Sequence, residues 1–274
     1  MYMKIFNVLL IAALSVSLGG CGHRYIDKSG VKSVSSTAAD YDTLSGDGRG
    51  WGFVKKKGAP PDILKAETEL LERYNGRYLD TCGEKLLYLT FDEGYENGFT
   101  APILDVLKRT ETPAAFFVTG QYLEGQRELI QRMIDEGHII GNHTVNHLNL
   151  PKQPVKTVQS ELTGLNEKCR ELYGYDMIYM RPPEGEISER VLAITNDLDM
   201  RTVMWSFAYK DWDVNVQRGA DYAYSSVMPY LHPGAVILLH AVSSDNASAL
   251  ERIITDAIAQ GYEFRSLDDL YDQE

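Results

Sequence analysis

The sequence predicts an α/β fold in which seven strand–helix units form a closed or nearly closed barrel. After residue 84, segments typical of strands and of helices alternate. Several of the strands, such as 114–118 and 235–239, are apolar throughout, which is typical of strands buried on both faces of a parallel sheet. No glycine-rich phosphate loop follows the first strand, so the alternative, a doubly wound open sheet, is less favoured.

Each element of this barrel is expected from its local pattern. Strands are expected at 85–91, 113–118, 138–141, 177–181, 201–206, 234–239 and 262–266. Helices are expected near 99–110, 123–136, 155–173, 188–198, 218–230 and 246–260. A further helix near 62–75 follows Pro60-Pro61. We therefore expect the alternating region, 85–274, to form the main domain, and residues 51–84 to form an N-terminal extension that packs on it.

The N-terminus has the pattern of a bacterial export signal. Lys4 provides a positive charge, and an apolar run over 8–18 follows it, too short for a stable membrane span. Leu18-Gly19-Gly20-Cys21 then resembles the lipobox of bacterial lipoproteins, in which the cysteine is diacylated. We expect a lipoprotein signal peptide at 1–20, lipidation at Cys21 and a flexible tether over 21–50. A plain signal peptide cleaved nearby is the alternative.

The overall charge limits the class of partner. The chain has 274 residues and a net charge of -12, with no basic stripe, which argues against nucleic acid. Nothing in the sequence indicates a protein partner. Cys82 and Cys169 allow one disulfide, but two free thiols are the preferred interpretation. An exported, lipid-anchored protein would lie on the outer face of the cytoplasmic membrane.

The segment Thr90-Phe91-Asp92-Glu93-Gly94-Tyr95 places two adjacent carboxylates at the end of an apolar strand. Such a pair needs a partner or a metal ion. His143 and His147 are four residues apart, a spacing that allows both to bind one ion. Two histidines and one carboxylate leave room for water, as in a catalytic zinc site. The alternative is a pair of structural histidines beside a strand.

Further polar residues follow other predicted strands. Asp92, His143, Arg181, Asp211 and His240 each come after a strand, and in a parallel barrel these ends meet on one face. Arg181 is suited to orient a carboxylate, and Asp211 could clamp it. His240 is suited to act as a general acid. Each of these residues has a structural alternative, a surface salt bridge for Arg181 and an ordinary strand-end histidine for His240.

These motifs resemble the polysaccharide deacetylases of the NodB-homology type, carbohydrate esterase family 4. The match runs from Leu86 to about Leu270. Five motifs carry it in order, Thr90 to Tyr95, His143 to His147, Arg181-Pro182-Pro183, Asp211-Trp212 and Leu239-His240. Trp51-Gly52-Phe53 and Tyr95 to Thr100 look more narrowly like the delta-lactam-biosynthetic de-N-acetylases, which act on N-acetylmuramic acid, typically in spore cortex.

The resemblance implies a distorted (β/α)7-type barrel and a role for each matching residue. Asp92 would be the general base, oriented by Arg181 with Asp211 behind it, and His240 the general acid. One divalent ion, zinc by default, would be held by Glu93, His143 and His147. The backbone N–H of Glu184 would help to polarise the oxyanion. The substrate pocket would be lined by Tyr95, Pro183, Glu184, Trp212 and Leu239.

Two residues depart from the usual family pattern. Glu93 stands where an aspartate ligand is usual, and its extra methylene alters the geometry available to a metal. Glu184 stands where a tyrosine is common, which makes the pocket rim more acidic. A muramic lactyl carboxylate would favour a cation, for which Lys152 or Lys210 is the candidate.

The expected function is metal-dependent hydrolysis of N-acetyl groups on peptidoglycan glycan strands, with N-acetylmuramic acid as the expected sugar. One alternative is deacetylation of N-acetylglucosamine or chitooligosaccharides. Another is a catalytically silent glycan-binding lipoprotein whose metal site is impaired by Glu93, although Asp92 and His240 are both present.

Overall fold

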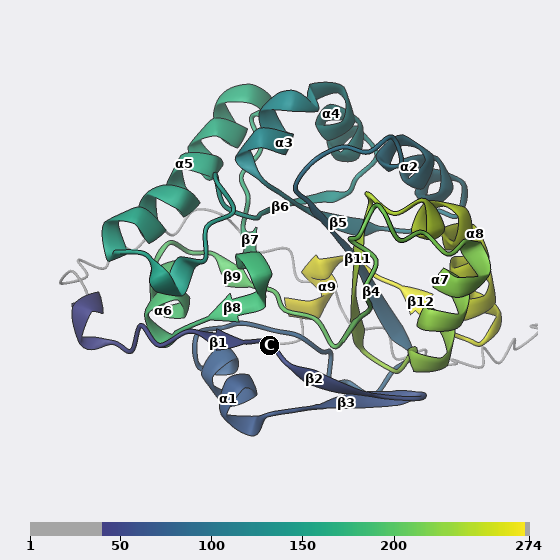
Figure 1. The fold of residues 1–274 in the computed structure, drawn as a ribbon, viewed down its shortest axis with the longest axis horizontal. Coiled ribbons are helices and arrows are strands. Elements are labelled where there is room, and N and C mark those ends of the chain that lie inside the picture. The colour runs from purple at the N-terminus through teal and green to yellow at the C-terminus, as the bar shows by residue number, and fades with distance from the viewer. Residues whose placement is uncertain (1–39, 272–274) are drawn as a thin grey trace, which may run out of the picture. The chain divides into compact units, whose positions relative to one another are not determined.

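The computed structural model describes residues 40–271 (Figure 1), so the signal peptide, Cys21 and most of the predicted tether lie outside the described residues. Within 40–271, no helix has both the length and the apolar character needed to cross a membrane.

A curled parallel sheet forms the centre of the domain. Its strands are β4 (Leu86–Glu93), β5 (Ala114–Val118), β6 (Ile139–Asn142), β7 (Tyr179–Met180), β9 (Arg201–Thr202), β10 (Phe207–Ala208), β11 (Ala235–His240) and β12 (Glu263–Phe264). Their order is β10-β11-β4-β5-β6-β7-β9, and β12 pairs with the start of β4. The predicted α/β class with a parallel sheet is confirmed.

The sheet curls into a half-barrel instead of closing through its own strands. Its end strands, β10 and β9, do not pair with each other. The segment before β4 connects the two sides of the curl, because Arg77 forms a parallel bridge with Val203, directly after β9, and Leu79 an antiparallel bridge with Ala235 of β11. A piece of the N-terminal extension therefore spans the gap.

The two faces of the sheet have different partners. In β4, Leu87, Leu89 and Phe91 belong to a large cluster shared with the helices, whereas Leu86 and Tyr88 belong to a second cluster inside the curl. This is the alternation that a strand imposes on its side chains. The side on which a residue of β4 lies thus follows from whether its number is odd or even.

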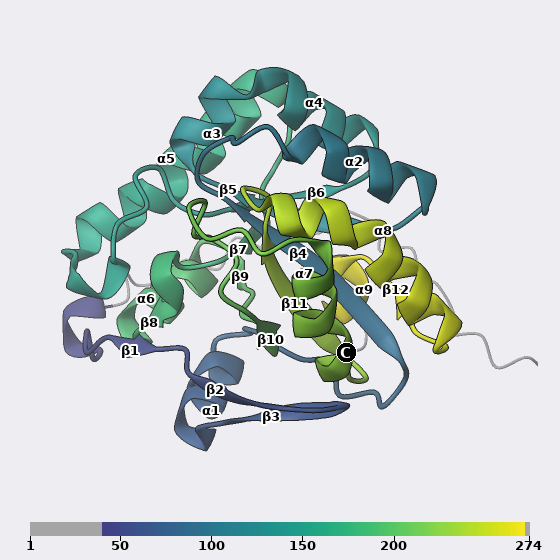
Figure 2. The same cartoon turned by 45° about the vertical axis from the view of Figure 1, so that its right-hand side comes forward.

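Helices cover the outer face of the curl (Figures 1 and 2). They are α2 (Thr100–Arg109), α3 (Gly120–Gly125), α4 (Arg127–Asp135), α5 (Val155–Tyr173), α6 (Glu189–Asp197), α7 (Ala220–Val227) and α8 (Ser244–Ala259). Two helices lie elsewhere: α1 (Lys65–Arg73) packs with Trp51 of the N-terminal extension, and α9 (Leu267–Tyr271) belongs to the cluster inside the curl. The helix expected over 123–136 is two helices, because Gln126 has non-helical dihedral angles, φ -115° and ψ 47°.

The predicted tether is too long at its C-terminal end. Residues 40–50 lie against the domain, where β1 (Arg49–Gly50) pairs antiparallel with β8 (Glu186–Ile187). The Tyr41 hydroxyl donates to Asp197, and the Arg190 amide donates to the carbonyl of Ser45. Residues 40–50 show no apolar periodicity, so the sequence pattern did not predict these contacts.

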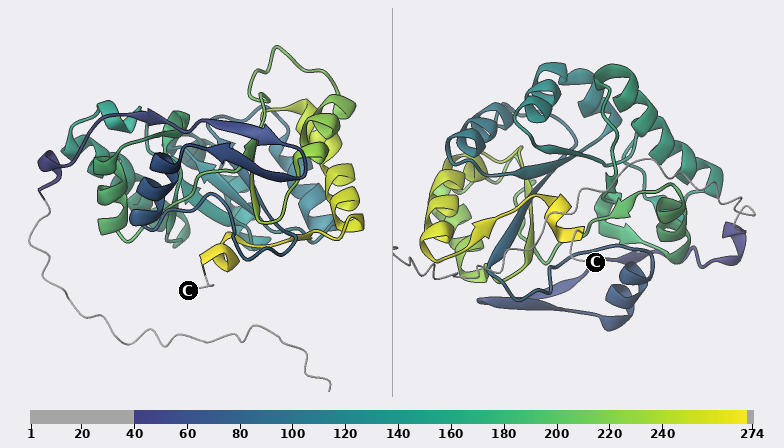
Figure 3. Two further views of the ribbon diagram at one scale, coloured as in Figure 1. Left: turned by 90° about the horizontal axis from the view of Figure 1, so that it is seen from below. Right: turned by 180° about the vertical axis from the view of Figure 1, so that it is seen from behind.

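A hairpin of β2 (Phe53–Lys56) and β3 (Ala59–Ile63) precedes α1 (Figure 3). Pro60 and Pro61 lie in β3 and not before a helix at residue 62, because a strand paired on one side tolerates residues without an N–H. The extension packs on the domain through Trp51, which is buried beside Leu71 and Met204. Cys82 and Cys169 do not form a disulfide with each other, as preferred from the sequence.

Candidate active site

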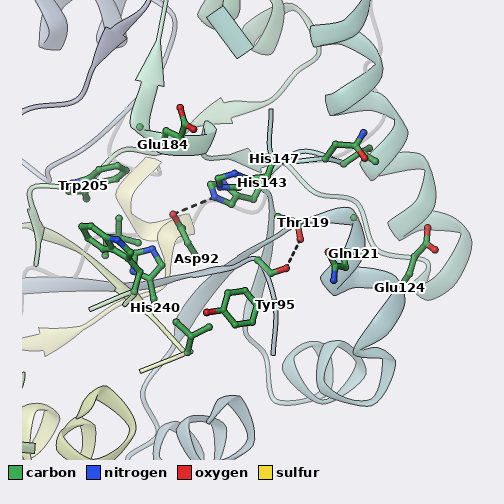
Figure 4. A pocket seen from close by; sticks show the side chains of 18 residues that line it. Asp92, Tyr95, Thr119, Gln121, Glu124, His143, His147, Glu184, Trp205 and His240 are labelled. Carbon is green, nitrogen blue, oxygen red and sulfur yellow. Dashed lines mark hydrogen bonds and ion pairs between the residues drawn. The ribbon is translucent and has the colours of Figure 1, made fainter. Parts of the chain in front are cut away.

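The carboxyl ends of the strands surround a cavity of about 1100 Å³. Asp92 and His240 lie opposite each other on neighbouring strands, since they are paired Cα partners in the register of β4 and β11. Figure 4 shows the Asp92 side chain between those of His143 and His240. The cavity is lined by Asp92, Gly94, Tyr95, Thr119, Gly120, Gln121, Glu124, His143, Val145, Asn146, His147, Glu184, Gly185, Trp205, Trp212, Leu238, His240 and Val242.

Asp92 is held by a fully buried arginine. Arg181 Nη1 donates to Asp92 Oδ1 at 2.9 Å and to Thr90 Oγ1 at 2.9 Å, and its Nε donates to the carbonyl of Val203 at 3.0 Å. Burial would raise the pKa of Asp92, but Arg181 and the nearby histidines lower it overall. Asp92 is therefore ionised at neutral pH and can accept a proton.

His240 is held by Asp211 on the other side of the cavity. Its Nδ1 lies 2.8 Å from Asp211 Oδ1, and its backbone N–H donates to Asp211 Oδ2 at 2.8 Å. Burial would lower the pKa of His240, but the Asp211 carboxylate raises it overall. With Nδ1 on the carboxylate, Nε2 is the ring nitrogen left to serve as a proton donor.

Asp211 does not clamp Arg181, contrary to the expectation from the sequence. It follows β10, which neighbours β11 and so lies beside His240, whereas Arg181 follows β7. Arg181 holds Asp92, and Asp211 holds His240. Two separate polar couples therefore face the cavity.

His143 and His147 lie together, with ring centroids 4.9 Å apart. His143 Nδ1 is 2.7 Å from the carbonyl of Arg181, so this nitrogen carries the proton and Nε2 presents a lone pair. Burial lowers the pKa of His143 to about 4, which keeps the ring neutral at pH 7. Neutral imidazoles with a fixed tautomer are suited to bind a metal ion.

The loop that carries the two histidines is fixed by two asparagines, Asn142 and Asn146. The Asn142 side chain donates to the carbonyl of Leu162 and accepts from the amide of Thr144. Asn146 donates to Glu161 through both its side chain and its backbone. These contacts hold the backbone of the loop.

The third predicted metal ligand, Glu93, is not in the cavity. Its side chain is fully buried on the outer face of β4, and neither carboxylate oxygen has a hydrogen-bond partner. Burial, together with Glu96 and Asp92, raises its pKa well above the ordinary value. No three His, Cys, Asp or Glu side chains of residues 40–271 are arranged to hold an ion. The two imidazoles fit a divalent ion, and the predicted carboxylate does not.

Two of the predicted pocket residues are also corrected. Leu239 packs with the helices, and Leu238 lines the cavity, because neighbouring residues of β11 point to opposite faces. Pro183 is buried and does not line the cavity, whereas Glu184 does. Tyr95 and Trp212 also line it, as predicted, and both are about half exposed.

Several residues of the site had no clear signal in the sequence. The Asn246 side chain donates to Asp211 Oδ2 at 2.6 Å and to the carbonyl of His240 at 3.1 Å, so it fixes the pair that Asp211 forms with His240. Gln121 and Glu124 line the cavity from α3. Lys152 and Lys210 do not line it, and the lining residues include no lysine or arginine.

Comparison with known proteins identifies relatives along most of the chain. A family model described as polysaccharide deacetylase matches residues 80–203. Peptidoglycan-N-acetylmuramic acid deacetylase PdaA of Bacillus subtilis (strain 168) is 46% identical over 239 residues, which are 86% of this chain and 91% of that protein. The solved structure of Bacillus subtilis PdaA, a family 4 carbohydrate esterase, matches with a TM-score of 0.81 and covers 84% of this chain and 99% of that chain.

A chitooligosaccharide deacetylase of Bradyrhizobium sp. (strain ANU 289) is 36% identical over 191 residues, which are 69% of this chain and 84% of that protein. The similar proteins thus include enzymes named for two different sugars.

Proposed function

Because the chain belongs to the polysaccharide deacetylase family, we propose that it hydrolyses the N-acetyl group of N-acetylmuramic acid in peptidoglycan. One observation carries the chemistry. An ionised carboxylate, Asp92, and an imidazole with a raised pKa, His240, face the same cavity from paired strands. This is the arrangement needed to take a proton from water and give one to a departing amine.

Enzymes of this family are metal-dependent, and a divalent ion, which we propose is zinc, would bind at His143 and His147, polarise the acetamide carbonyl and lower the pKa of water. Asp92 accepts the proton of the attacking water through Oδ2, while Arg181 holds Oδ1. The backbone N–H of Glu184, at the cavity wall, donates to the oxyanion.

His240 completes the reaction. Its Nε2 protonates the sugar nitrogen as the C–N bond breaks, while Asp211 stabilises the charged ring. The products are acetate and a free amino sugar. In a muramic residue that amine can then condense with the lactyl carboxyl group, with release of one water molecule, to close a lactam.

N-acetylmuramic acid is proposed as the substrate because the similarity to PdaA covers both chains almost completely. We propose that residues without a stem peptide are preferred. N-acetylglucosamine is the second candidate, and one observation favours it: no lysine or arginine lines the cavity to meet a lactyl carboxylate.

The test is mass spectrometry of muropeptides after incubation of the purified chain with peptidoglycan, treated or not with an amidase that removes stem peptides. We expect acetyl loss from muramic residues, mainly in the treated sample. Acetyl loss only from glucosamine residues would replace the proposed substrate. Absence of acetate release from both samples would favour a silent glycan-binding protein.

We also propose that Cys21 is lipidated and anchors the domain on the outer face of the cytoplasmic membrane, with use in sporulation. The lipobox-like sequence supports the anchor. Cys21→Ser should move the protein from the membrane fraction to the soluble fraction. A wild-type protein found wholly soluble with an unmodified Cys21 would contradict the proposal.

A further inference from the structure

We propose that Glu93 is not a metal ligand in this protein and that the divalent ion is held by His143 and His147 alone, with water in its other positions. The inference rests on the proposed function only in that the enzyme uses a divalent ion. It concerns how this chain binds that ion, and not which sugar it deacetylates.

The direction of the Glu93 side chain follows from the strand that carries it. Thr90 and Asp92 point into the curl, where Arg181 donates to both of them. Phe91 points outward into the cluster shared with the helices. Glu93 is the next residue of the same strand, so it points outward as well.

The surroundings of Glu93 agree with this direction. Its side chain is fully buried and is absent from the cavity that His143 and His147 line. The charges that act on it come from Glu96 and Asp92, and it acts in turn on Tyr122. Glu96 and Tyr122 are hydrogen-bonded to each other at 3.0 Å, so Glu93 lies beside an existing polar contact outside the cavity.

A simple side-chain rotation does not bring Glu93 to the histidines. Its backbone is paired with Val118 in the register of β4 and β5, and its carbonyl accepts from the Thr119 amide at 3.1 Å. To turn Glu93 inward, the end of β4 would have to separate from β5. That movement would also displace Asp92 from Arg181, because the two carboxylates are adjacent.

Of the side chains that line the cavity, the two imidazoles are the pair that lies together with a free ring nitrogen facing Asp92. His143 Nε2 lies 3.7 Å from Asp92 Oδ2, but no third His, Cys, Asp or Glu side chain of the described part completes a ligand set with the two histidines. The extra methylene of Glu93 therefore does not bring its carboxylate to the ion. Asp92 stays available as the base, and several water molecules can bind the ion.

The experiment is a titration of the purified full chain with Co²⁺, whose visible absorption reports the number and type of its ligands. Four variants are compared with the wild type: Glu93→Gln, His143→Ala, His147→Ala and Glu124→Gln. The last is the matched control, since it removes one carboxylate charge from the cavity wall. Circular dichroism checks that each variant is folded.

We expect Glu93→Gln to keep the wild-type absorption bands and to bind Co²⁺ as Glu124→Gln does. Each histidine variant should bind at least ~10-fold more weakly, as loss of a ligand or its support commonly does. Weakening of ~10-fold or more in Glu93→Gln relative to Glu124→Gln, with shifted bands, would overturn the inference. So would a wild-type chain that binds no Co²⁺.

A second variant keeps the inference testable if Glu93→Gln does not fold. Glu93→Asp retains the charge and shortens the side chain, so a ligand at this position would change the Co²⁺ bands, whereas we expect none to change. Acetate release by the wild type is measured separately. Its absence would contradict the proposed function and leave the metal titration unaffected.

Discussion

Replacing Arg181 by methionine should destabilise the domain strongly, because it leaves the Asp92 carboxylate buried without its guanidinium partner. Arg181 is fully buried, and its donors reach Asp92, Thr90 and the carbonyl of Val203 at 2.9–3.0 Å. Removing one partner of a buried ion pair costs about 3–5 kcal/mol. Methionine fills part of the volume but donates no hydrogen bond.

This loss is large compared with the free energy of unfolding of a typical domain, about 5–15 kcal/mol. The assay is urea-induced unfolding of the purified chain at pH 7, followed by circular dichroism. We expect Arg181→Met to lower the free energy of unfolding by about 3–5 kcal/mol. Arg181→Lys should lower it less, because the charge remains but the forked geometry is lost.

The double variant Arg181→Met/Asp92→Asn separates the charge from the packing. Removing the orphaned carboxylate should recover at least about 1 kcal/mol relative to Arg181→Met, because an unpaired buried charge costs more than an amide. The reasoning would be refuted if Arg181→Met cost less than about 1 kcal/mol, or if the second substitution made the protein still less stable.

Three further outcomes are expected. Asp92→Asn should keep the fold and remove most acetate release, and His240→Ala should slow acetate release by ~10²–10⁴-fold, each measured as kcat. Near-normal turnover in either variant would contradict the role proposed for the residue that was replaced. Asp211 raises the pKa of His240, and His240 must be protonated to act as the general acid. Asp211→Asn should therefore move the alkaline limb of the pH–rate profile to lower pH. If the limb does not move, His240 is not the group that titrates there. Leu238→Ala should change the KM ratio of N-acetyl to N-propionyl substrates, because Leu238 lines the cavity. Leu239→Ala should mainly lower the free energy of unfolding, by about 2–5 kcal/mol, because Leu239 packs with the helices. The reverse pattern would contradict the faces of β11 assigned to the two leucines.

The convergence of the site was predictable from the sequence for a simple reason. Asp92, His143, Arg181, Asp211 and His240 each follow a strand, and the carboxyl ends of parallel strands share one edge. Which of these residues touch each other was not predictable. Contacts depend on strand order in the sheet, and that order places Asp211 beside His240 and not beside Arg181.

Leu239 and Glu93 were misplaced for a different reason. The family pattern suggested that residues next to Asp92 and His240 also face the cavity. Because side chains alternate along a strand, an inward Asp92 requires an outward Glu93, and an inward Leu238 requires an outward Leu239. The strand geometry was thus the better guide at these positions.

The elements that the sequence did not reveal are short and polar. The strand at Arg49–Gly50 has two exposed residues, so no alternation of apolar side chains marks it. The hairpin strand Ala59–Ile63 contains two prolines and alternates only weakly. Elements of this kind are held by backbone pairing, which does not depend on a recognisable side-chain pattern.

The pairing of Asp92 with His240 has a consequence for what the enzyme can accommodate. Parallel strands are about 4.8 Å apart in the hydrogen-bonding direction, so the interval between the proton acceptor and the proton donor is set by the backbone of two adjacent strands. Loops can be rebuilt without altering that interval. If Asp92 and His240 act as proposed, the space for the acyl group between them is therefore set by the core of the domain, whereas Tyr95, Glu184 and Trp212 line the same cavity from outside the paired strands.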